Sequence, residues 1–229
     1  MDLNYAKKLI EKNKKDFNII ANQFSQTRKY LWPELKKLKK YIKRNTRVVD
    51  MGCGNGRLFN LFKNKNIDYI GIDISESLIQ KAKEEYGDHF KQANILNLPF
   101  KDNSFNQAWM IAVLHHIPSR ELRIQALKEI KRVLKKNGNA IITCWNLYQP
   151  RYFKILFKYT FRKIFKKSKL DFKDVFIPWK RKNIQRYYHA FTKKELKKEL
   201  KKAGFEVKKI QHLKRKNKKL HILAITKKP

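Results

Sequence analysis

The chain has 229 residues, with 56 Lys and Arg against 19 Asp and Glu, and its formal net charge is +37 at pH 7. Hydrophobic residues make up 42% and aromatic residues 13%, so the chain can bury a substantial core and is not a disordered basic tail. Its 7 Gly and 6 Pro exclude collagen-like and low-complexity sequences. So large a positive excess predicts a polyanionic partner, with nucleic acid favoured over a membrane surface.

The number of cysteines and the N-terminal residues indicate the cellular compartment in which the protein is expected. Cys53 and Cys144 are too few for a disulfide framework, and they cannot complete a structural zinc site alone. Residues 1–8 lack the apolar core of a signal peptide, and no stretch approaches the ~20 apolar residues of a membrane span. We therefore expect a cytoplasmic protein with no metal site and no stable membrane association.

Residues 1–45 have the hydrophobic pattern of helices. Apolar residues recur at near-helical spacing, and Pro33, which follows Trp32, is expected to start or kink the second helix. The apolar positions are Leu9, Phe17, Ile20, Phe24, Leu31, Leu35, Leu38 and Ile42. This segment predicts a helical N-terminal extension.

Residues 46–145 alternate short apolar runs with helical patterns. The expected strands are residues 47–50, 69–73, 109–114 and 140–145. The expected helices begin at Arg57, at Ser75 and at Ser119, and the last ends near Lys135, before Asn137-Gly138. Alternation at this spacing predicts a mostly parallel sheet covered by helices on both faces.

The remaining residues form an insertion and a C-terminal segment. Residues 146–190 are basic and aromatic, and a helix over residues 192–202 is followed by strands near 205–213 and 220–227. These two strands are expected to pair as an antiparallel edge. We predict a single α/β domain over residues 1–229: a Rossmann-like, mostly parallel seven-stranded sheet with helices on both faces, an N-terminal helical extension (1–45), a core (46–145), a basic insertion after the fifth strand and a C-terminal part (191–229).

A glycine-rich segment, Val48-Val-Asp-Met-Gly-Cys-Gly-Asn-Gly-Arg57, joins a strand to a helix. Backbone N–H groups and the positive end of a helix would face a ligand there. The segment lacks the Gly-Lys-Ser/Thr ending of a phosphate loop, and its third glycine falls one residue early for a dinucleotide fingerprint. Asp50-x-Gly-x-Gly-x-Gly instead resembles the first motif of class I S-adenosylmethionine-dependent methyltransferases.

That resemblance implies S-adenosylmethionine as the cofactor. The loop would carry its amino-acid end, Asp73 would hold the ribose hydroxyls, and the segment around Asn94 would cradle adenine. Asn94 and Asn106 stand where the family usually has acidic residues. The expected cofactor-binding residues are Asp50, Gly52, Cys53, Gly54, Asn55, Gly56, Asp73, Ile74, Asn94, Ile95 and Ile111.

Other segments narrow the resemblance across nearly the whole chain. These segments are Ile20-Ala-x-x-Phe-Ser-x-Thr-Arg28, Ile111-Ala-Val-Leu-His-His116, Asp174-Val-Phe-Ile-Pro-Trp179 and Arg186-Tyr-Tyr-His-x-Phe191. Together they resemble tRNA wobble-uridine methyltransferases, which esterify 5-carboxymethyluridine in the anticodon. The sequence departs from that family at Leu122, where an Arg is usual, and at Asn217-Lys218, where an Asn–aromatic pair is usual. The resemblance implies the tRNA anticodon loop as substrate and a small zinc-containing activator protein as partner.

The chemistry of ester formation allows this interpretation. A carboxylate with a pKa near ~4 is already ionised at pH 7, so the site needs no general base and only has to hold the anion in line with the methyl group. Arg28 can do so through two parallel hydrogen bonds. Arg28, His115 and His116 are therefore the expected catalytic residues, acting by orientation.

Further substrate contacts are expected from a motif near residue 190, and each has an ordinary structural alternative. The expected residues are Arg186, Tyr187, Tyr188 and His189. Tyr187 and Tyr188 are equally consistent with ordinary core aromatic residues. One of the two adjacent histidines could instead be packed at the end of a strand, and Arg28 could be an exposed residue of a surface helix.

Residues 151–186 interleave many Lys and Arg with aromatic residues, against only Asp171 and Asp174. Phosphate neutralisation combined with stacking on unpaired bases is how folded RNA loops are bound. Lys163, Lys166 and Lys167 are the expected RNA contacts. Residues 154–167 are also compatible with a basic amphipathic helix on a membrane, or with a helix whose apolar face packs on the protein.

Three function classes therefore stay open at the level of sequence. They are a tRNA anticodon methyltransferase, a methyltransferase for a small molecule or lipid quinone, and a non-catalytic RNA-binding relative. Cofactor binding separates the third from the other two, and salt-sensitive tRNA binding separates the first from the second.

Overall fold

The computed structural model describes residues 1–63, 65–179, 184–215 and 218–229. Its strands are β1 (Arg47–Met51), β2 (Asp68–Asp73), β3 (Phe90–Gln92), β4 (Phe105–Ile111), β5 (Leu134–Trp145), β6 (Asp174–Trp179), β7 (Ile184–His189), β8 (Glu206–Arg215) and β9 (Lys218–Lys227). Its α-helices are α1 (Leu3–Thr27), α2 (Pro33–Lys36), α3 (Glu76–Tyr86), α4 (Arg120–Val133), α5 (Pro150–Ile164) and α6 (Lys193–Lys202). Three 3₁₀ helices are η1 (Lys37–Tyr41), η2 (Arg57–Leu61) and η3 (Leu114–His116).

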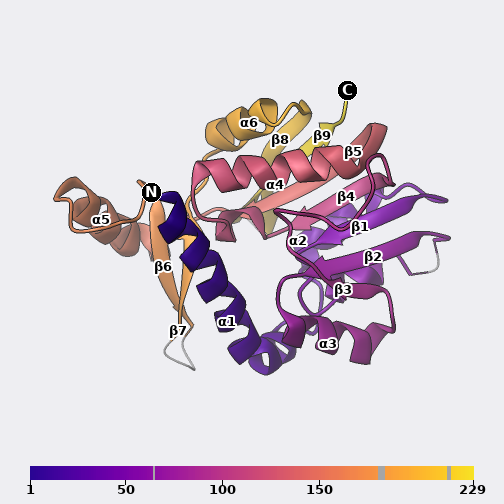
Figure 1. Ribbon diagram of the computed structural model, residues 1–229, viewed down its shortest axis with the longest axis horizontal. Helices are drawn as coiled ribbons and strands as arrows, with labels where there is room; N and C mark the ends of the chain where they lie inside the picture. Colours follow the sequence, from indigo (N-terminus) through magenta and orange to yellow (C-terminus); the bar gives the residue numbers. More distant parts are fainter. Residues whose placement is uncertain (64, 180–183, 216–217) are drawn as a thin grey trace.

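Seven strands form the central sheet in the order β3-β2-β1-β4-β5-β9-β8 (Figure 1). The first five strands pair in parallel, and β9 runs antiparallel to both β5 and β8. This confirms the Rossmann-like, mostly parallel sheet and its antiparallel edge.

Helices cover both faces because successive residues of each strand point to opposite sides. Val49 of β1 joins the core beneath α4 and α6, whereas Val48 joins the core beneath α2, η1 and α3. The ends of the helices follow ordinary capping chemistry. Pro33 begins α2, and the Thr192 side chain accepts from the Glu195 N–H to cap α6.

Several expected boundaries were wrong. Helix α4 ends at Val133, and β5 begins at Leu134, which pairs with Phe105 at the start of β4. The helix expected from Arg57 is the short 3₁₀ helix η2, which ends with the Phe62 N–H donating to the Phe59 carbonyl. The seventh strand of the expected sheet, β3, had not been located in the sequence, and the β6–β7 pair was not expected.

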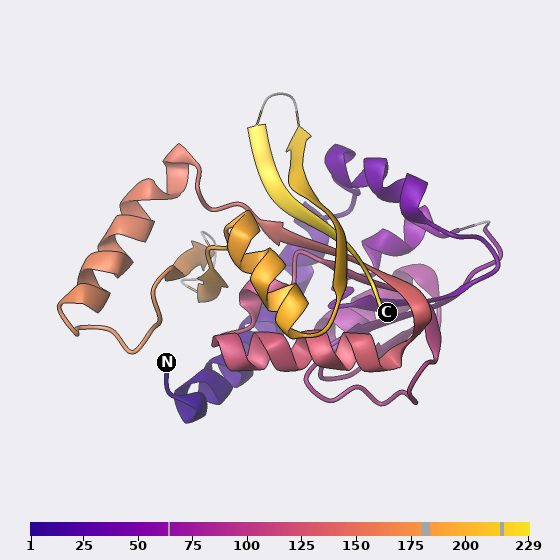
Figure 2. The ribbon, with the colours of Figure 1, turned by 90° about the horizontal axis from the view of Figure 1, so that it is seen from above.

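The basic insertion contains α5 and a separate two-stranded antiparallel sheet, β6–β7. Tyr152, Leu156 and Tyr159 of α5 pack against a cluster that includes Tyr188 of β7. The opposite face of α5 is open, with Phe157 74% exposed, and Figure 2 shows α5 lying well away from the central sheet. The helix therefore packs on one face only.

The long helix α1 crosses the ends of the parallel strands and links the β6–β7 sheet to α3 (Figure 1). Lys12 Nζ donates to the Gln185 carbonyl at 2.8 Å, and the Ser75 hydroxyl hydrogen-bonds with Asn18 Oδ1 at 2.6 Å. The N-terminal extension thereby forms one wall of the region beyond the strand ends.

Candidate functional site

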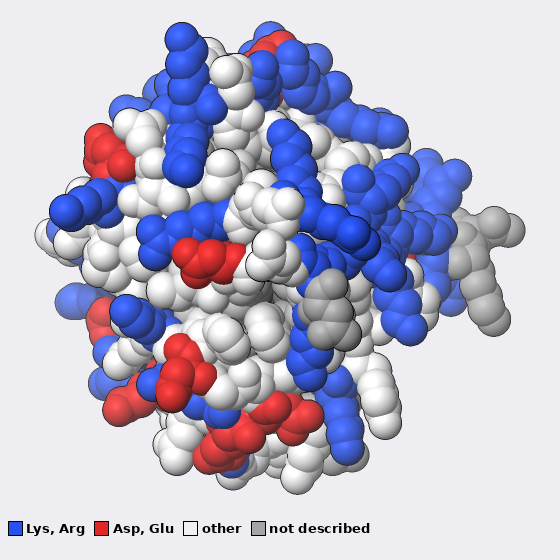
Figure 3. Space-filling model, turned by 90° about the vertical axis from the view of Figure 1, so that its right-hand side faces the viewer, with Lys and Arg blue, Asp and Glu red and all other residues white. Residues whose placement is uncertain are grey.

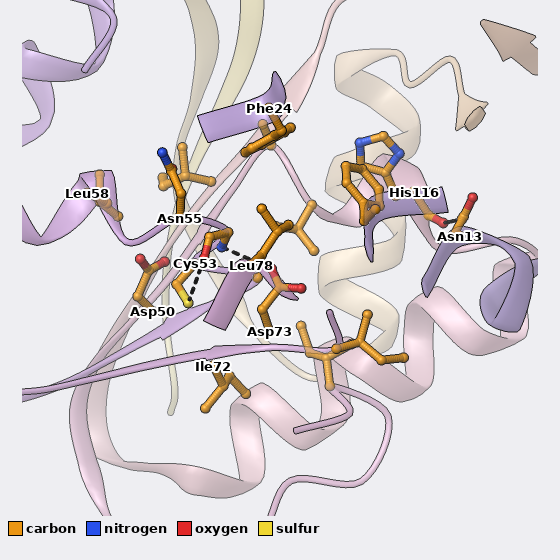
Figure 4. A pocket seen from close by; sticks show the side chains of 18 of the residues that line it. Asn13, Phe24, Asp50, Cys53, Asn55, Leu58, Ile72, Asp73, Leu78 and His116 are labelled. Carbon is orange, nitrogen blue, oxygen red and sulfur yellow. Dashed lines mark hydrogen bonds between the residues drawn. The ribbon is translucent and has the colours of Figure 1, made fainter. Parts of the chain in front are cut away.

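A cavity lies beyond the carboxyl ends of β1, β2 and β4, where parallel α/β sheets bind their ligands (Figure 4). Its floor is the glycine loop after β1 and the end of β2, and one wall is α1. The side chains of Arg186 and Tyr188, from β7, close another side. The cavity thus joins residues from the N-terminal extension, the core and the insertion.

The glycine loop is tied to the end of β2 by its backbone. The N–H groups of Gly52 and Cys53 both donate to the Ile72 carbonyl, at 2.7 and 2.9 Å, and the Gly54 N–H donates to Asp73 Oδ2 at 2.9 Å. Gly52 has a φ of +72°, and a Cβ atom there would lie 2.4 Å from Val113 Cγ2. Only glycine fits between the loop and the residues after β4.

We expect Gly52→Ala to lower S-adenosylmethionine affinity by about tenfold or more, because the loop must shift to relieve both the clash and the left-handed backbone strain. Gly87→Ala is the matched control, since Gly87 has a φ of +83° but open space around its Cβ position. Calorimetry measures the affinity, and thermal denaturation separates local from global damage. Wild-type affinity in Gly52→Ala would contradict this role of the loop.

Two carboxyl groups face the cavity from neighbouring strands. Burial raises the pKa of Asp50 to about 7, although the Tyr69 hydroxyl donates to its Oδ2 at 2.7 Å. Burial also raises the pKa of Asp73, against the opposing effect of the Gly54 and Ser75 N–H groups that donate to it. The Asp73 carboxylate has about four acceptor positions, so it can still accept from a hydroxyl donor beside these N–H groups. This arrangement fits a cationic cofactor that carries a ribose.

Apolar side chains and one amide line the third part of the cavity. Ile74, Ile95 and Ile111 offer flat apolar contacts suited to a purine. Asn94 also lines the cavity, but its Oδ1 accepts from the Leu96 N–H at 3.0 Å. Asn106 lies elsewhere, and its Oδ1 accepts from the Arg47 N–H at the start of β1. The residues present therefore fit S-adenosylmethionine, without an acid at the adenine end.

Two arginines flank one tryptophan on the α1 side of the cavity. The Cζ atoms of Arg28 and Arg186 lie 4.9 and 4.7 Å from the ring centroid of Trp179. Arg186 is 5% exposed and its buried Nε has no partner in the described part of the chain. Burial, and then the charge of Arg186, lower the pKa of Arg28 to about 10. Neither guanidinium group forms an ion pair with a carboxylate of the described residues, so the two together make a strong anion site.

The two adjacent histidines have different surroundings. His116 lines the cavity, and burial followed by the charge of Arg186 lowers its pKa to about 3. Its Nδ1 lies 3.0 Å from the Tyr187 carbonyl, which can only accept, so Nδ1 carries the proton and Nε2 is an acceptor. His115 is fully buried and stacks on Tyr188 at 5.3 Å, outside the cavity lining. His115 can therefore act only indirectly, through Tyr188 and through Trp145, whose backbone N–H donates to His115 Nδ1 at 3.3 Å.

The structure places several expected site residues outside the cavity. Tyr187 is buried against Leu9 and Leu170, and His189 lies between Asp174 and Glu195. Gly56 is packed beneath α3 and Phe90. Lys163, at the end of α5, and Lys166 and Lys167, just after it, face solvent to different degrees away from the cavity. Lys180, Arg181, Lys182 and Asn217 lie outside the described residues.

Other cavity residues were not identified from sequence as site residues. Asn13, Phe17 and Phe24 form one face of α1 together with Arg28, so their helical spacing was the available signal. Trp32, Arg57 and Trp145 form a second wall, in which Arg57 Cζ lies 4.1 Å from the Trp32 ring. Nothing local in the sequence links residues 32, 57 and 145.

Cys53 and Cys144 are buried free thiols, and the described residues hold no group of three or more His, Cys, Asp or Glu placed for a metal ion. Within the same residues, no helix combines the length and apolarity needed to cross a bilayer.

Known proteins share both the sequence and the fold. Residues 49–142 match the methyltransferase domain family. The tRNA (carboxymethyluridine(34)-5-O)-methyltransferase of Schizosaccharomyces pombe is 32% identical over 215 residues, covering 82% of this chain and 86% of that protein. Proteins of the same name from Xenopus tropicalis, Saccharomyces cerevisiae, mouse and Arabidopsis thaliana match over only 20 to 53% of their lengths.

Solved structures agree with this relationship. A S-adenosylmethionine-dependent methyltransferase from Methanosarcina mazei superposes with a TM-score of 0.71 at 25% identity, covering 86% of this chain and 98% of that one. A methyltransferase in complex with the Trm112 methyltransferase activator of Haloferax volcanii shares the fold, with a TM-score of 0.67 at 16% identity, covering 95% of this chain and 97% of that one. This chain belongs to the S-adenosylmethionine-dependent methyltransferases, in the family of the tRNA (carboxymethyluridine(34)-5-O)-methyltransferases.

Proposed function

We propose that this chain methylates a carboxylate oxygen of 5-carboxymethyluridine at the wobble position of tRNA and thereby forms a methyl ester. The observation that carries the proposal is the pair of arginines, Arg28 and Arg186, around Trp179 beside the cofactor cavity. We further propose that residues 1–229 act as one methyltransferase domain in the cytoplasm. The names of the related proteins support the substrate class.

The cofactor would be held by the floor of the cavity. Asp73 would accept from its ribose hydroxyls, the Gly52–Asn55 part of the loop would surround its amino-acid end, and Ile95 and Ile111 would contact its base. S-adenosylmethionine, when bound, supplies a methyl group on a sulfonium that an aligned nucleophile can displace. The protein contributes position and exclusion of water from the site.

The substrate carboxylate would be bound by the guanidinium groups of Arg28 and Arg186, whose planar forks match its two oxygens. Because this acceptor is ionised at pH 7, the cavity requires no base, and neutral His116 does not supply one. His116 instead offers Nε2 as an acceptor, which suits the N3–H of a uracil ring. Tyr188 would support both groups, since its ring contacts His116 and Arg186.

The pH dependence of the reaction follows from these pKa values. We expect the single-turnover rate at saturating cofactor to be nearly flat from about pH 6 to 9, because neither the carboxylate nor His116 titrates there. Cofactor affinity should instead rise as the pH increases through about 7, where Asp50 ionises and attracts a cationic ligand. A log-linear rise of the single-turnover rate between about pH 7 and 9 would contradict a carboxylate acceptor and favour an amine or phenol.

The insertion would hold the anticodon loop. Phe153, Phe157 and Phe161 form an exposed row on α5, and the Phe157 and Phe161 rings lie 6.4 Å apart and nearly parallel at 28°. Such rings can stack on unpaired bases, while neighbouring lysines neutralise phosphates. Lys163, Lys166 and Lys167 are the proposed phosphate contacts.

Replacing these three lysines with Ala should reduce the magnitude of the log–log salt slope of tRNA binding by up to about 2, if each contacts one phosphate of a single strand. Lys197, Lys198 and Lys201 of α6, replaced together by Ala, remove the same charge and are the control. An unchanged slope in the α5 variant would indicate that this helix serves packing only.

We also propose a small zinc-containing activator protein of the Trm112 type as a partner. The fold shared with the methyltransferase of the Haloferax volcanii complex supports this assignment. Co-expression with such a protein should raise the thermal midpoint of this chain, and calorimetry of the purified pair measures binding.

The stability in alkali of the bond to the transferred methyl group tests the proposed function. tRNA labelled by the enzyme from S-adenosylmethionine with a radioactive methyl group should release volatile labelled methanol in mild alkali, because esters hydrolyse under conditions that leave N- and C-methyl groups intact. Alkali-stable label would refute ester formation. Label in lipid or small-molecule extracts but not in tRNA would favour the alternative methyltransferase class, and cofactor binding without transfer to any acceptor would favour a non-catalytic relative.

A further inference from the structure

The β8–β9 pair ends in two like-charged cross-strand pairs. Lys214 lies opposite Lys219, and Arg215 lies opposite Lys218. All four side chains are exposed, and the pair projects beyond the rest of the sheet (Figure 2). Like charges placed directly opposite in a sheet are destabilising. Within each pair the two Cβ atoms lie ~5 Å apart, well inside a Debye length of ~10 Å at 0.1 M salt. Because successive residues of a strand point to opposite sides, the two pairs lie on opposite faces of this end of the β8–β9 pair, with Arg215 on the face toward α2.

Little in the described chain relieves this repulsion. Glu34 Oε2 lies 3.8 Å from Arg215 Nε, but Glu34 is only 2% exposed and its other oxygen is 3.4 Å from His221 Nε2. The four cations form no other ion pair with the described residues. The arrangement therefore costs the free protein stability that a bound polyanion would restore.

The N-terminal extension adds more cations beside this end of the sheet. α2 contacts β8, and α2 and η1 expose Lys36, Lys37, Lys39 and Lys40. We name these lysines, together with Lys214, Arg215, Lys218 and Lys219, the basic ridge. In Figure 3, Lys and Arg crowd the right-hand side, toward which the β8–β9 pair projects, whereas Asp and Glu gather mainly near the bottom.

The basic ridge differs in chemistry from α5. None of the strongly exposed large hydrophobic side chains among the described residues stands between these cations in the sequence; Tyr30, 79% exposed, precedes α2, and five of the others belong to residues 153–165. A surface with cations but no apolar anchors can neither stack on bases nor insert into a bilayer. It matches the regularly spaced phosphates of a double-stranded nucleic acid.

The ridge is continuous with the wall of the cavity. Trp32 lines the cavity immediately before α2, and its ring lies 5.3 Å from that of His221 in β9. Arg57, on the same wall, has its Cζ 4.1 Å from the Trp32 ring. A nucleic acid with one nucleotide in the cavity can therefore lay its neighbouring helix along the ridge.

We propose that the basic ridge binds the phosphate backbone of the double-stranded stem adjoining the nucleotide that enters the cavity. The proposal rests on the proposed function for the identity of the RNA, but it makes a separate claim about where the stem lies. It assigns the stem to the ridge and the unpaired loop to α5.

The test compares two variants with equal charge changes in the full-length protein. The ridge variant combines Lys214→Ala, Arg215→Ala, Lys218→Ala and Lys219→Ala, and the control combines Lys197→Ala, Lys198→Ala, Lys201→Ala and Lys202→Ala on α6. The probes are a labelled anticodon stem–loop and a single strand with the loop sequence alone. Affinity is measured by fluorescence anisotropy over a range of salt concentrations.

The ridge variant should bind the stem–loop about tenfold or more weakly, with a salt slope reduced in magnitude by about 2 to 3.5, since each lost duplex phosphate contact contributes ~0.9. Its affinity for the single strand should stay close to that of the control variant. Its thermal midpoint should not fall, because the substitutions remove mutual repulsion. Equal losses in the two variants, or equal losses on the two probes, would overturn the proposal.

Two further measurements distinguish this proposal from membrane binding by the ridge and from the proposed methyltransferase function. Sedimentation with vesicles of anionic lipid should show no dependence on the ridge, and a loss of vesicle binding with unchanged RNA binding would assign the ridge to a membrane instead. Methyl transfer is measured separately on the stem–loop. A stem–loop that binds through the ridge but is not methylated would refute the proposed function while leaving the ridge assignment intact.

Discussion

Arg28→Lys is expected to slow single-turnover methyl transfer by about two orders of magnitude while changing S-adenosylmethionine affinity by less than about threefold. The substitution keeps the positive charge but removes the planar fork that binds both carboxylate oxygens. It also removes the packing of the guanidinium group on Phe24 and Trp179, 4.4 and 4.9 Å from their ring centroids. The rate is measured with saturating cofactor and excess enzyme.

Two companion variants sharpen this experiment. Arg186→Lys should slow transfer similarly, since the Arg186 Cζ lies 4.7 Å from the centroid of the same Trp179 ring. Arg44→Lys, at an exposed position outside the site, should leave the rate unchanged. The Arg28 carbonyl accepts from Asn55 Nδ2, so Arg28 also borders the glycine loop. A parallel loss of cofactor affinity in Arg28→Lys would show that Arg28 binds the carboxylate of the cofactor, contradicting its assignment to the substrate.

Asp73→Ala is expected to weaken S-adenosylmethionine binding by about tenfold to a hundredfold. Loss of charge-assisted hydrogen bonds to the ribose costs about 1.5–3 kcal/mol, and each 1.4 kcal/mol is tenfold in affinity. The same substitution frees the Gly54 and Ser75 N–H groups that Asp73 now accepts from, at 2.9 and 2.8 Å, so the glycine loop also loses its anchor. Calorimetry measures the effect directly.

Asp88→Ala provides the matched control for this variant, because the Asp88 side chain is 98% exposed. It removes one carboxylate from the same chain and should leave affinity within about twofold of wild type. Wild-type affinity in Asp73→Ala would contradict the placement of the cofactor at this end of β2. It would also contradict the assignment of the glycine loop to cofactor binding.

The sequence predicted the parts of the fold that local patterns determine. The apolar run after Arg47 identified β1, and the apolar run before Asp73 identified β2. The glycines between these runs identified the loop that follows β1. Thr192 and Gly204 marked the two ends of α6 because capping chemistry is local. Leu134 was wrongly assigned to the preceding helix. It pairs with Phe105 of the neighbouring strand, and the spacing of apolar residues along the chain carries no information about such a contact.

The site was predictable only where resemblance supplied it. Arg28 and Arg186 were both identified, but their meeting over Trp179 depends on α1 and the β6–β7 sheet converging from opposite ends of the chain. His115 and His116 are adjacent in sequence, yet only His116 reaches the cavity, because η3 turns between them. The like-charged pairs of the basic ridge appear only once the register of β8 and β9 is known.

Methylation of a defined anticodon stem–loop tests the central claim most directly. Three synthetic stem–loops that differ only at the wobble position would carry 5-carboxymethyluridine, its uncharged carboxamide analogue, or plain uridine. With saturating S-adenosylmethionine and the proposed activator, mass spectrometry of the digested nucleosides should find one added methyl group on 5-carboxymethyluridine alone, removed again by mild alkali. Methylation of the carboxamide or uridine stem–loop, or none of the carboxylate stem–loop by cofactor-bound enzyme, would contradict the assignment of this site to a wobble carboxylate.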